Sequence, residues 1–150
     1  MIILRPALAE DVMVILSMRK EFYSIDQYPF DEEEQARMTT DLILHPSAGI
    51  LYIILKESKS IGYVCLTYGY SFEYGGKIAF VDELFLVPDQ RDKGIGSQVM
   101  DFIITKAKEL KLATLHLEAE THNDKANRLY SKKGFKNTNR FLLFNKLNTL

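Results

Sequence analysis

Residues 87–97, VPDQRDKGIGS, place two glycines one residue apart at the point where an amphipathic helix is about to begin. An apolar run, residues 78–87, precedes them, and apolar side chains recur at helical spacing over residues 99–110. Glycine destabilises a helix by about 1 kcal/mol relative to alanine, so Gly94 and Gly96 indicate a special backbone geometry. A strand, a glycine turn and a helix N-terminus together present free N–H groups beside a positive dipole end, which suits a phosphate.

Short apolar runs alternate with amphipathic segments along the rest of the chain. The spacing and capping signals predict four helices: one from residue 12, one from Asp31 to the residue before His45, one after the glycines, and one over 123–133 that ends at Gly134. Strands are predicted at the N-terminus and over 50–57, 60–70, 78–87 and 113–120, with a terminal strand or hairpin over 134–147. This order predicts a mixed α/β or α+β sandwich.

The composition limits the class of protein. A chain of 150 residues with 47% hydrophobic residues is long enough for one domain, so we expect a single domain over 1–150. The net charge of −1 comes from mixed charges and argues against binding to nucleic acid. No apolar run approaches the roughly 20 residues that span a bilayer, so we expect no membrane association and a cytoplasmic location.

The single cysteine and the histidines do not suggest a metal centre. Cys65 stands alone, which excludes an intramolecular disulfide, and its apolar surroundings predict a small buried side chain. His45 and His122 lie at predicted loops or helix ends without the partners of a metal site. We therefore expect chemistry that needs no metal.

Three phosphate-binding patterns compete at the glycine turn. The Walker pattern fails because no Gly-Lys-Ser/Thr occurs, and the dinucleotide fingerprint fails because Val99 stands at its third glycine. What remains is R-x-x-G-x-G, formed by Arg91, Gly94 and Gly96 after a Val-Pro pair. This resembles the acetyl-coenzyme A (acetyl-CoA) signature of the GNAT N-acetyltransferase superfamily, which commonly has glycine where this chain has Asp92.

A second pattern strengthens the resemblance. The segment NDKANRLYSKKGF matches the family's N-x-x-A-x-x-x-Y-x-x-x-G-F motif at residues 123–135. Asn123 and Tyr130 lie seven residues apart, which places them on one helical face. The resemblance implies that Tyr130 protonates the departing thiolate as a general acid. It also implies cofactor contacts from Leu86, Val87, Arg91, Asp92, Lys93, Gly94, Ile95, Gly96, Ser97, Asn123, Ala126 and Tyr130.

Each residue of this second motif also has a purely structural interpretation. Asn123 has the character of a helix N-cap, and Gly134 that of a C-cap glycine. Tyr130 would then be a core aromatic residue whose hydroxyl reaches the surface.

A protonated amine must lose a proton before it attacks a thioester, so a base is expected. Strand alternation over 78–87 places Asp82 and Glu83 on opposite faces of the sheet. The superfamily often has a carboxylate in this strand, and the resemblance favours Glu83 as the base with Asp82 as the alternative. An ion pair or an exposed strand edge would also explain these acids.

Two loops are expected to shape the acceptor pocket. Tyr28, Phe30, Phe72, Glu73 and Tyr74 would form an aromatic wall with acid among it, which suits a cationic amine. Alternatively, Tyr28 and Phe30 pack on the core. The alternation of LHLEAE places His116, Glu118 and Glu120 together, at an acceptor cleft, a subunit interface or solvent. Asp82 and Glu118 are the further substrate-side candidates.

The resemblance implies a GNAT-like α/β fold of the α+β type. It predicts a mixed, mostly antiparallel sheet of six or seven strands with helices on both faces, splayed around Val87 and Leu115 to admit acetyl-CoA. The implied activity is direct transfer of an acetyl group to a small cationic amine. The alternatives are a protein or peptide N-acetyltransferase and a non-catalytic acyl-CoA sensor, and family analogy suggests a homodimer.

Overall fold

The computed structural model describes residues 1–148 of the chain. Two compact units divide it, Met1–Glu118 and Ala119–Leu150. We call them the first and second unit and describe each by itself. In residues 1–148, no helix has the length and apolar character that a membrane span requires.

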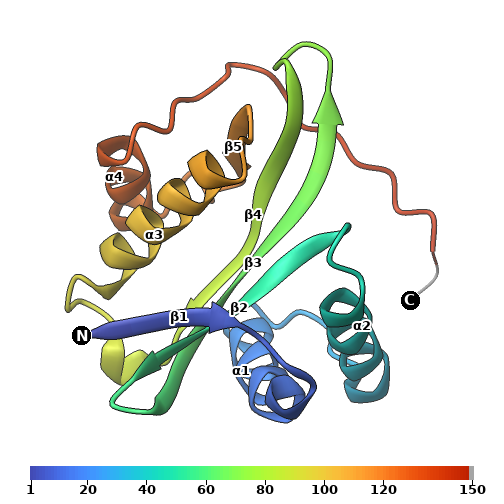
Figure 1. The fold of residues 1–150 in the computed structure, drawn as a ribbon, viewed down its shortest axis with the longest axis vertical. Helices are drawn as coiled ribbons and strands as arrows, with labels where there is room; N and C mark the ends of the chain where they lie inside the picture. Colours follow the sequence, from blue (N-terminus) through green and yellow to red (C-terminus); the bar gives the residue numbers. More distant parts are fainter. Residues whose placement is uncertain (149–150) are drawn as a thin grey trace. The chain divides into compact units, whose positions relative to one another are not determined.

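The first unit is built on a single five-stranded sheet. Its strands follow the order β1-β2-β3-β4-β5, and every neighbouring pair is antiparallel except the parallel pair β4–β5 (Figure 1). The strands are β1 (Ile2–Pro6), β2 (Gly49–Lys56), β3 (Lys59–Ser71), β4 (Gly76–Leu86) and β5 (Thr114–Leu117).

The strand count is lower than the six or seven predicted. The predicted strand over 113–120 ends at Leu117, so Glu118 and Glu120 lie beyond it. The predicted terminal strand over 134–147 does not form within the described residues, although the segment contains several apolar side chains of the kind that favour strands. A strand requires a partner for its N–H and C=O groups, and this segment joins no sheet there; Phe141 is 96% exposed.

Helices cover both faces of this sheet. In the first unit these are α1 (Val12–Ile25), α2 (Glu32–Leu44) and α3 (Ile95–Glu109), with short 3₁₀ turns η1 (Ala9–Asp11) and η2 (Pro88–Gln90). Figure 1 shows α1 and α2 on one side of the sheet and α3 on the other. The predicted cap of α2 is confirmed, because the Asp31 carboxylate accepts a hydrogen bond from the Glu34 N–H at 2.9 Å.

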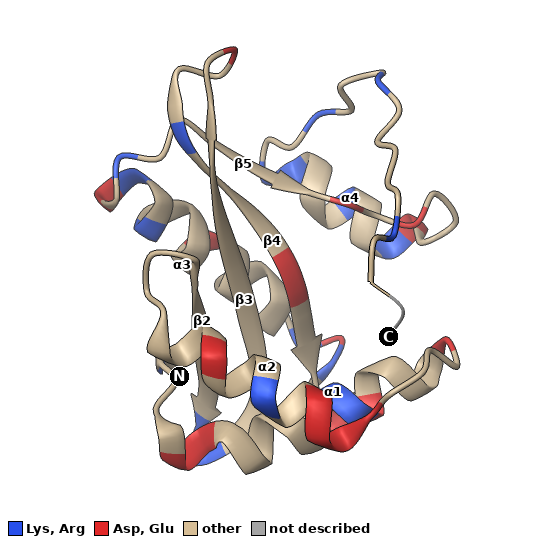
Figure 2. Ribbon diagram, turned by 90° about the vertical axis from the view of Figure 1, so that its right-hand side faces the viewer, with Lys and Arg blue, Asp and Glu red and all other residues tan. Residues whose placement is uncertain are grey.

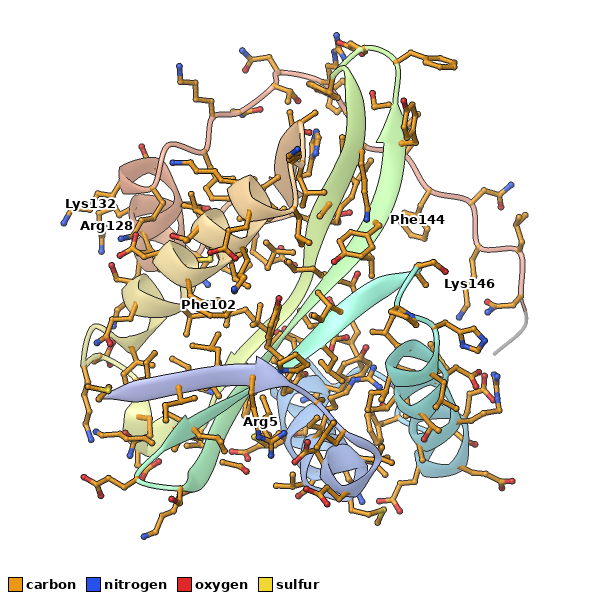
Figure 3. The ribbon with its side chains drawn as sticks, in the orientation of Figure 1. Arg5, Phe102, Arg128, Lys132, Phe144 and Lys146 are labelled. Carbon is orange, nitrogen blue, oxygen red and sulfur yellow. The ribbon has the colours of Figure 1, made fainter. Side chains whose placement is uncertain are left out.

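Two apolar clusters hold these layers together. Between the sheet and α1, the fully buried Ile15 packs with Tyr63 and Phe85. On the opposite face, Val99 and Ile103 of α3 pack against the sheet, and the Phe102 ring lies 5.2 Å from that of Tyr52 (Figure 3). Burial on this scale contributes about 25 cal/mol per Å² of apolar surface. The sheet therefore has no solvent-facing side along its centre.

The pairing between β4 and β5 ends early, which leaves part of β4 unpaired on one side. β5 pairs with Ile78 to Val81 of β4 and leaves the sheet after Leu117. β4 continues to Leu86 with only β3 beside it among the described residues. The predicted splay around Val87 and Leu115 is displaced on the β5 side, because Leu115 still pairs with Ala79 and the strands separate only after Leu117. The unpaired part of β4 leads directly into the glycine turn.

Candidate active site

The special backbone geometry that the sequence predicted is confirmed at Gly94 but not at Gly96, which has no positive φ and is the second residue of α3 (Ile95–Glu109). Gly94 has a φ of 75°, in the left-handed region, and nothing lies within 4 Å of where its Cβ would be. Asp92 also has a positive φ, 62°. Gly94 is the N-cap of α3 and offers no side-chain cap, so the first-turn N–H groups of that helix point beyond its end. The turn is therefore an open cradle of backbone donors with a positive helix end behind it.

The basic residues of the cradle have different roles. The Arg91 Nε donates a hydrogen bond to the Leu86 carbonyl at 2.9 Å, and its guanidinium lies 5.3 Å from the centre of the Phe85 ring. Arg91 thus ties the cradle to the end of β4, while Lys93 is exposed. The Val87 N–H donates to the Ile61 carbonyl at 2.9 Å, which fixes the other side of this junction.

The second unit contains the short helix α4 (Asp124–Lys132) that carries the second motif. The Asn123 side chain accepts a hydrogen bond from the Ala126 N–H at 3.2 Å, so it caps this helix, as the structural alternative predicted. Arg128 and Lys132 extend from α4 (Figure 3).

The C-terminus of α4 explains the Gly-Phe pair of the motif. Gly134 has a φ of 92°, and the Phe135 N–H donates to the Tyr130 carbonyl at 3.0 Å. The Gly134 N–H donates to the Ser131 carbonyl, which completes a Schellman motif. The rings of Tyr130 and Phe135 lie 6.1 Å apart, and this apolar contact across the cap holds the Tyr130 side chain in place.

A cavity of about 390 Å³ lies in the first unit, lined by residues of α1, α2, β2, β3 and β4 and of the loop that follows α2. Its charged and ionisable lining residues include Arg19, Asp41, His45, Asp82 and Glu83. Sequence reasoning did not identify the α2 contribution, Asp41 and His45. The sequence predicted that this helix ends before His45-Pro46, but it did not predict which side chains of the helix would face the cavity.

Glu83 lies at the centre of a buried hydrogen-bond network. Its Oε1 accepts hydrogen bonds from the Arg19 Nε at 3.1 Å and from the Tyr63 hydroxyl at 2.8 Å. Its Oε2 accepts from the Tyr23 hydroxyl at 2.6 Å and from the Arg19 Nη2 at 3.5 Å. The Glu83 side chain is 14% exposed and that of Arg19 10%, so this ion pair is largely removed from water.

The network raises the pKa values of Tyr23, Tyr63 and Arg19. Burial and the Glu83 carboxylate raise the pKa of Tyr23 to about 12, and the same two causes raise the pKa of Tyr63. Burial opposes the charge on Arg19, but attraction to Glu83 outweighs it and raises the pKa of Arg19. Arg19 therefore stays charged and both phenols stay protonated, as donors, at neutral pH.

A β-bulge corrects the predicted placement of Asp82. Cys65 pairs with Glu83 and Leu66 with Val81, so Asp82 is the extra residue on β4. Simple alternation predicts opposite faces for Asp82 and Glu83, whereas both line the same cavity. Figure 2 shows this acidic part of β4 in red, in the middle of the strand.

Asp82 and Cys65 respond to this environment in different ways. Desolvation, followed by repulsion from Glu83, raises the pKa of Asp82, although Arg19 opposes that shift. Burial raises the pKa of the Cys65 thiol to about 12. Cys65 is therefore a protonated, buried side chain, as predicted, and not a nucleophile.

The predicted aromatic wall divides into separate groups. The Tyr28 and Phe30 rings lie 6.4 and 5.4 Å from the ring of Tyr23, next to the Glu83 network. The Tyr74 ring lies 4.8 Å from that of His116, which stacks on Phe80. Phe72 is 96% exposed beside Tyr70, and Glu73 and Glu118 are also exposed. None of the predicted wall residues is among those that line the cavity.

Solved structures resemble the chain along nearly its whole length. An integron cassette protein from the mobile metagenome of the Cole Harbour Salt Marsh is 30% identical, with a TM-score of 0.87 over 97% of this chain and 90% of that one. A predicted acetyltransferase from Clostridium acetobutylicum, solved with acetyl-CoA, is 19% identical, with a TM-score of 0.78 over 97% and 96% of the two chains. An aminoglycoside antibiotic 6'-N-acetyltransferase, AAC(6')-Ih from Acinetobacter baumannii, is 18% identical, with a TM-score of 0.77 over 97% and 98%.

The two acetyltransferase structures are 19% and 18% identical to this chain, so their similarity shows a shared fold. The model of the acetyltransferase (GNAT) family matches residues 14–135, which include the cradle, the acidic cavity strand and the motif of α4. The match extends over both units, and the chain belongs to the GNAT acetyltransferase family.

Proposed function

We propose that this protein is an acetyl-CoA-dependent N-acetyltransferase whose acceptor is the primary amine of a small cationic molecule. The observation that carries this proposal is the acidic cavity on β4, since the same strand leads into the phosphate cradle. The cradle accounts for the donor of the acetyl group, and the cavity accounts for the acceptor.

The cradle fits the pyrophosphate of acetyl-CoA on three grounds. The positive φ of Gly94 and the open space at its Cβ position let backbone N–H groups approach a phosphate closely. The first turn of α3 has no side-chain cap to compete for those groups. Arg91 and Lys93 add positive charge, which favours an anion. Ile95, Gly96 and Ser97 would supply the N–H donors.

The unpaired part of β4 fits the remainder of such a ligand. From Asp82 to Leu86 the strand lacks β5 as a neighbour, so its backbone groups are available to an extended partner. Acetyl-CoA, when bound, supplies a thioester whose C–S bond breaks as the acceptor nitrogen forms a C–N bond to the acetyl carbon. The contribution of this chain is to bind, orient and move protons.

The charge of the cavity favours a cationic acceptor. Asp41, Asp82 and Glu83 line it, and Arg19 is the one Lys or Arg side chain among its lining residues. Arg19 is paired with Glu83, and Asp41 is paired with Arg37 at 2.9 Å. Among the ion pairs of the described residues, Asp82 is therefore the lining carboxylate that has no partner, and it gives the cavity a negative charge. An alkyl ammonium with a pKa near 10.4 enters such a space more readily than a neutral or acidic molecule.

Two proton transfers complete the proposed reaction. A carboxylate of β4 takes a proton from the acceptor ammonium, and the Tyr130 hydroxyl gives one to the departing sulfur. The role of Tyr130 rests on its motif, and the Schellman cap with Phe135 provides the rigid support that such a group requires. A Tyr130→Phe variant is expected to lower kcat at least tenfold while the affinity for acetyl-CoA stays within about twofold.

A panel of amines tests the proposed acceptor class. Spermidine, kanamycin, lysine and an alanine-initiated peptide would each be incubated with the protein and acetyl-CoA, and free thiol release would be followed. We expect turnover with spermidine or kanamycin and a KM that rises as salt screens the cavity. Turnover with the peptide alone would favour a protein N-acetyltransferase. Acetyl-CoA binding without any turnover would favour a sensor.

A further inference from the structure

The β-bulge places the neighbouring carboxylates Asp82 and Glu83 in different surroundings. We infer that Asp82 accepts the proton of the acceptor ammonium, and that Glu83 is a positioning residue that holds Arg19, Tyr23 and Tyr63 in place. This inference rests on the proposed function. It reverses the order that the sequence resemblance suggested, in which Glu83 came first.

Both carboxylate oxygens of Glu83 already accept hydrogen bonds from other residues. A carboxylate has about four lone-pair positions, and four donor contacts, from Arg19 and two phenols, reach its two oxygens. Protonation would remove at least one of these contacts. It would also leave the guanidinium of Arg19 buried without its counter-charge, which is strongly unfavourable.

The contacts of Glu83 also connect it to the rest of the first unit. Arg19 reaches from α1 to the Thr39 hydroxyl of α2 at 3.0 Å, and Tyr23 contacts the Tyr28 and Phe30 rings of the loop between those helices. Tyr63 extends the network to β3. Glu83 is therefore the point at which α1, β3 and β4 are held in register around the cavity.

Asp82 has the opposite properties. As the extra residue of the bulge it lines the cavity, and its side chain accepts no hydrogen bond in the network that Glu83 organises. The residue as a whole is exposed and it lines the cavity in which we place the acceptor amine. Bulges commonly redirect a side chain next to an active site, and here the bulge brings a second carboxylate to the face of the first.

The charged and ionisable groups around Asp82 come from every neighbouring element. Glu83 on β4 and Glu118 beyond β5 repel its negative charge, and Arg19 on α1 attracts it. Asp41 of α2, which pairs with Arg37, lines the same cavity, as do His45 just beyond α2 and the protonated Tyr63 and Cys65 of β3. Together these effects raise the pKa of Asp82. A carboxylate with a raised pKa is a stronger base and accepts a proton from an ammonium more readily.

The proposed step conserves atoms and charge. An N–H bond of the acceptor ammonium breaks, its proton forms an O–H bond with Asp82, and the electron pair stays on nitrogen for attack on the acetyl carbon. Asp82 then releases the proton to solvent. Over the whole reaction the nitrogen loses two protons. One passes through Asp82 to solvent, and the other replaces the proton that the Tyr130 hydroxyl gives to the coenzyme A thiolate.

Thermal unfolding of the ligand-free protein tests the structural half of this assignment. Glu83→Gln weakens a buried ion pair, so we expect its unfolding temperature to fall by at least about 5 °C. Asp82→Asn removes a charge without a hydrogen-bonded partner, so its unfolding temperature should stay within about 2 °C of the wild type. This readout requires neither acetyl-CoA nor an acceptor.

Steady-state kinetics test the catalytic half, with the best acceptor among spermidine, kanamycin, lysine and the peptide. At pH 7.5, Asp82→Asn should lower kcat about 100-fold with KM within about threefold. The deficit should shrink as the pH approaches about 10, where the amine loses its proton without help. Asp82→Glu should recover part of kcat. Asp41→Asn, which removes the carboxylate that compensates Arg37 at the edge of the cavity, should chiefly raise KM.

Two results would overturn the assignment. One is a full kcat in Asp82→Asn at pH 7.5. The other is a 100-fold loss of kcat in Glu83→Gln with an unchanged unfolding temperature, since a positioning residue must act through structure. If wild-type protein acetylates none of the four probes, the proposed function fails and the assignment of Asp82 fails with it. That result differs from a variant-specific loss because the wild type itself is inactive.

Discussion

Asp92 adopts a φ of 62°, a left-handed conformation that favours glycine over residues with a Cβ. The sequence resemblance marked this position as one where the family commonly has glycine, and the backbone geometry gives the physical reason. The residue also adds a negative charge to the turn that forms the cradle proposed for a pyrophosphate. We therefore expect that glycine at this position would suit both the backbone and an anionic ligand better.

Replacing Asp92 separates these two effects. Asp92→Gly should stabilise the fold by about 0.5 to 1 kcal/mol and tighten the binding of coenzyme A severalfold. Asp92→Asn keeps a side chain that tolerates the left-handed region, so it should improve binding without the full gain in stability. Thermal unfolding and titration calorimetry with coenzyme A would measure the two quantities. Weaker binding by both variants would show that the carboxylate itself supports the turn.

Asp11 provides a pH-dependent contribution at the N-terminal side of α1. Its carboxylate accepts hydrogen bonds from the Arg5 Nη1 at 2.7 Å and Nη2 at 3.0 Å, and these chiefly lower the pKa of Asp11 below its usual 3.8. A lowered folded-state pKa means that the stabilisation is fully present above the unfolded value and is lost as the pH falls through the folded value.

Acid titration of stability tests this pair. The wild-type unfolding temperature should fall between pH 4 and pH 2 more steeply than that of Asp11→Asn, because the variant has no carboxylate to protonate. Above pH 5 the variant should be the less stable protein. Parallel curves for the two proteins would mean that Asp11 does not contribute through its charge.

At the scale of elements, the sequence was sufficient to predict features that depend on a few adjacent residues. It was not sufficient to predict features that depend on how strands pair or how helices pack. The start of α2 at Asp31 and the end of α4 at Gly134 were predicted because each depends on a few adjacent residues. The bulge at Asp82 was missed because it exists only in the register of β4 against β3. The cavity contribution of α2 was missed for the same reason, since it depends on where that helix packs.

The C-terminal cap of α4 offers a direct test at this scale. Gly134→Ala forces a Cβ into a φ of 92° and should cost about 1 kcal/mol or more of unfolding free energy. Ser131→Ala, on the same helix, keeps the backbone bonds of the cap and should change stability by less than about 0.5 kcal/mol. Chemical denaturation of the two variants would compare them. Equal stabilities would mean that the cap geometry is relaxed at no cost.

At the scale of the whole molecule, β4 connects the two sites that we propose, the acidic cavity and the phosphate cradle. The strand carries the acidic residues in its middle and ends at the cradle that begins α3. The glycine turn between a predicted strand and a predicted helix was sufficient to predict the cradle, and the overall α+β class followed from the order of elements. The division of labour between Asp82 and Glu83 required the three-dimensional network, because both are carboxylates adjacent in the sequence.

The most direct test of the central claim is thermal unfolding with and without acetyl-CoA, with ATP and NAD as controls. Ligand at a hundred times its Kd adds about 2.7 kcal/mol of stability, which corresponds to roughly 5 to 10 °C for a chain of this length. We predict such a rise with acetyl-CoA and a smaller one or none with the controls. No rise with millimolar acetyl-CoA would contradict the account, because the glycine turn would then have only a structural role.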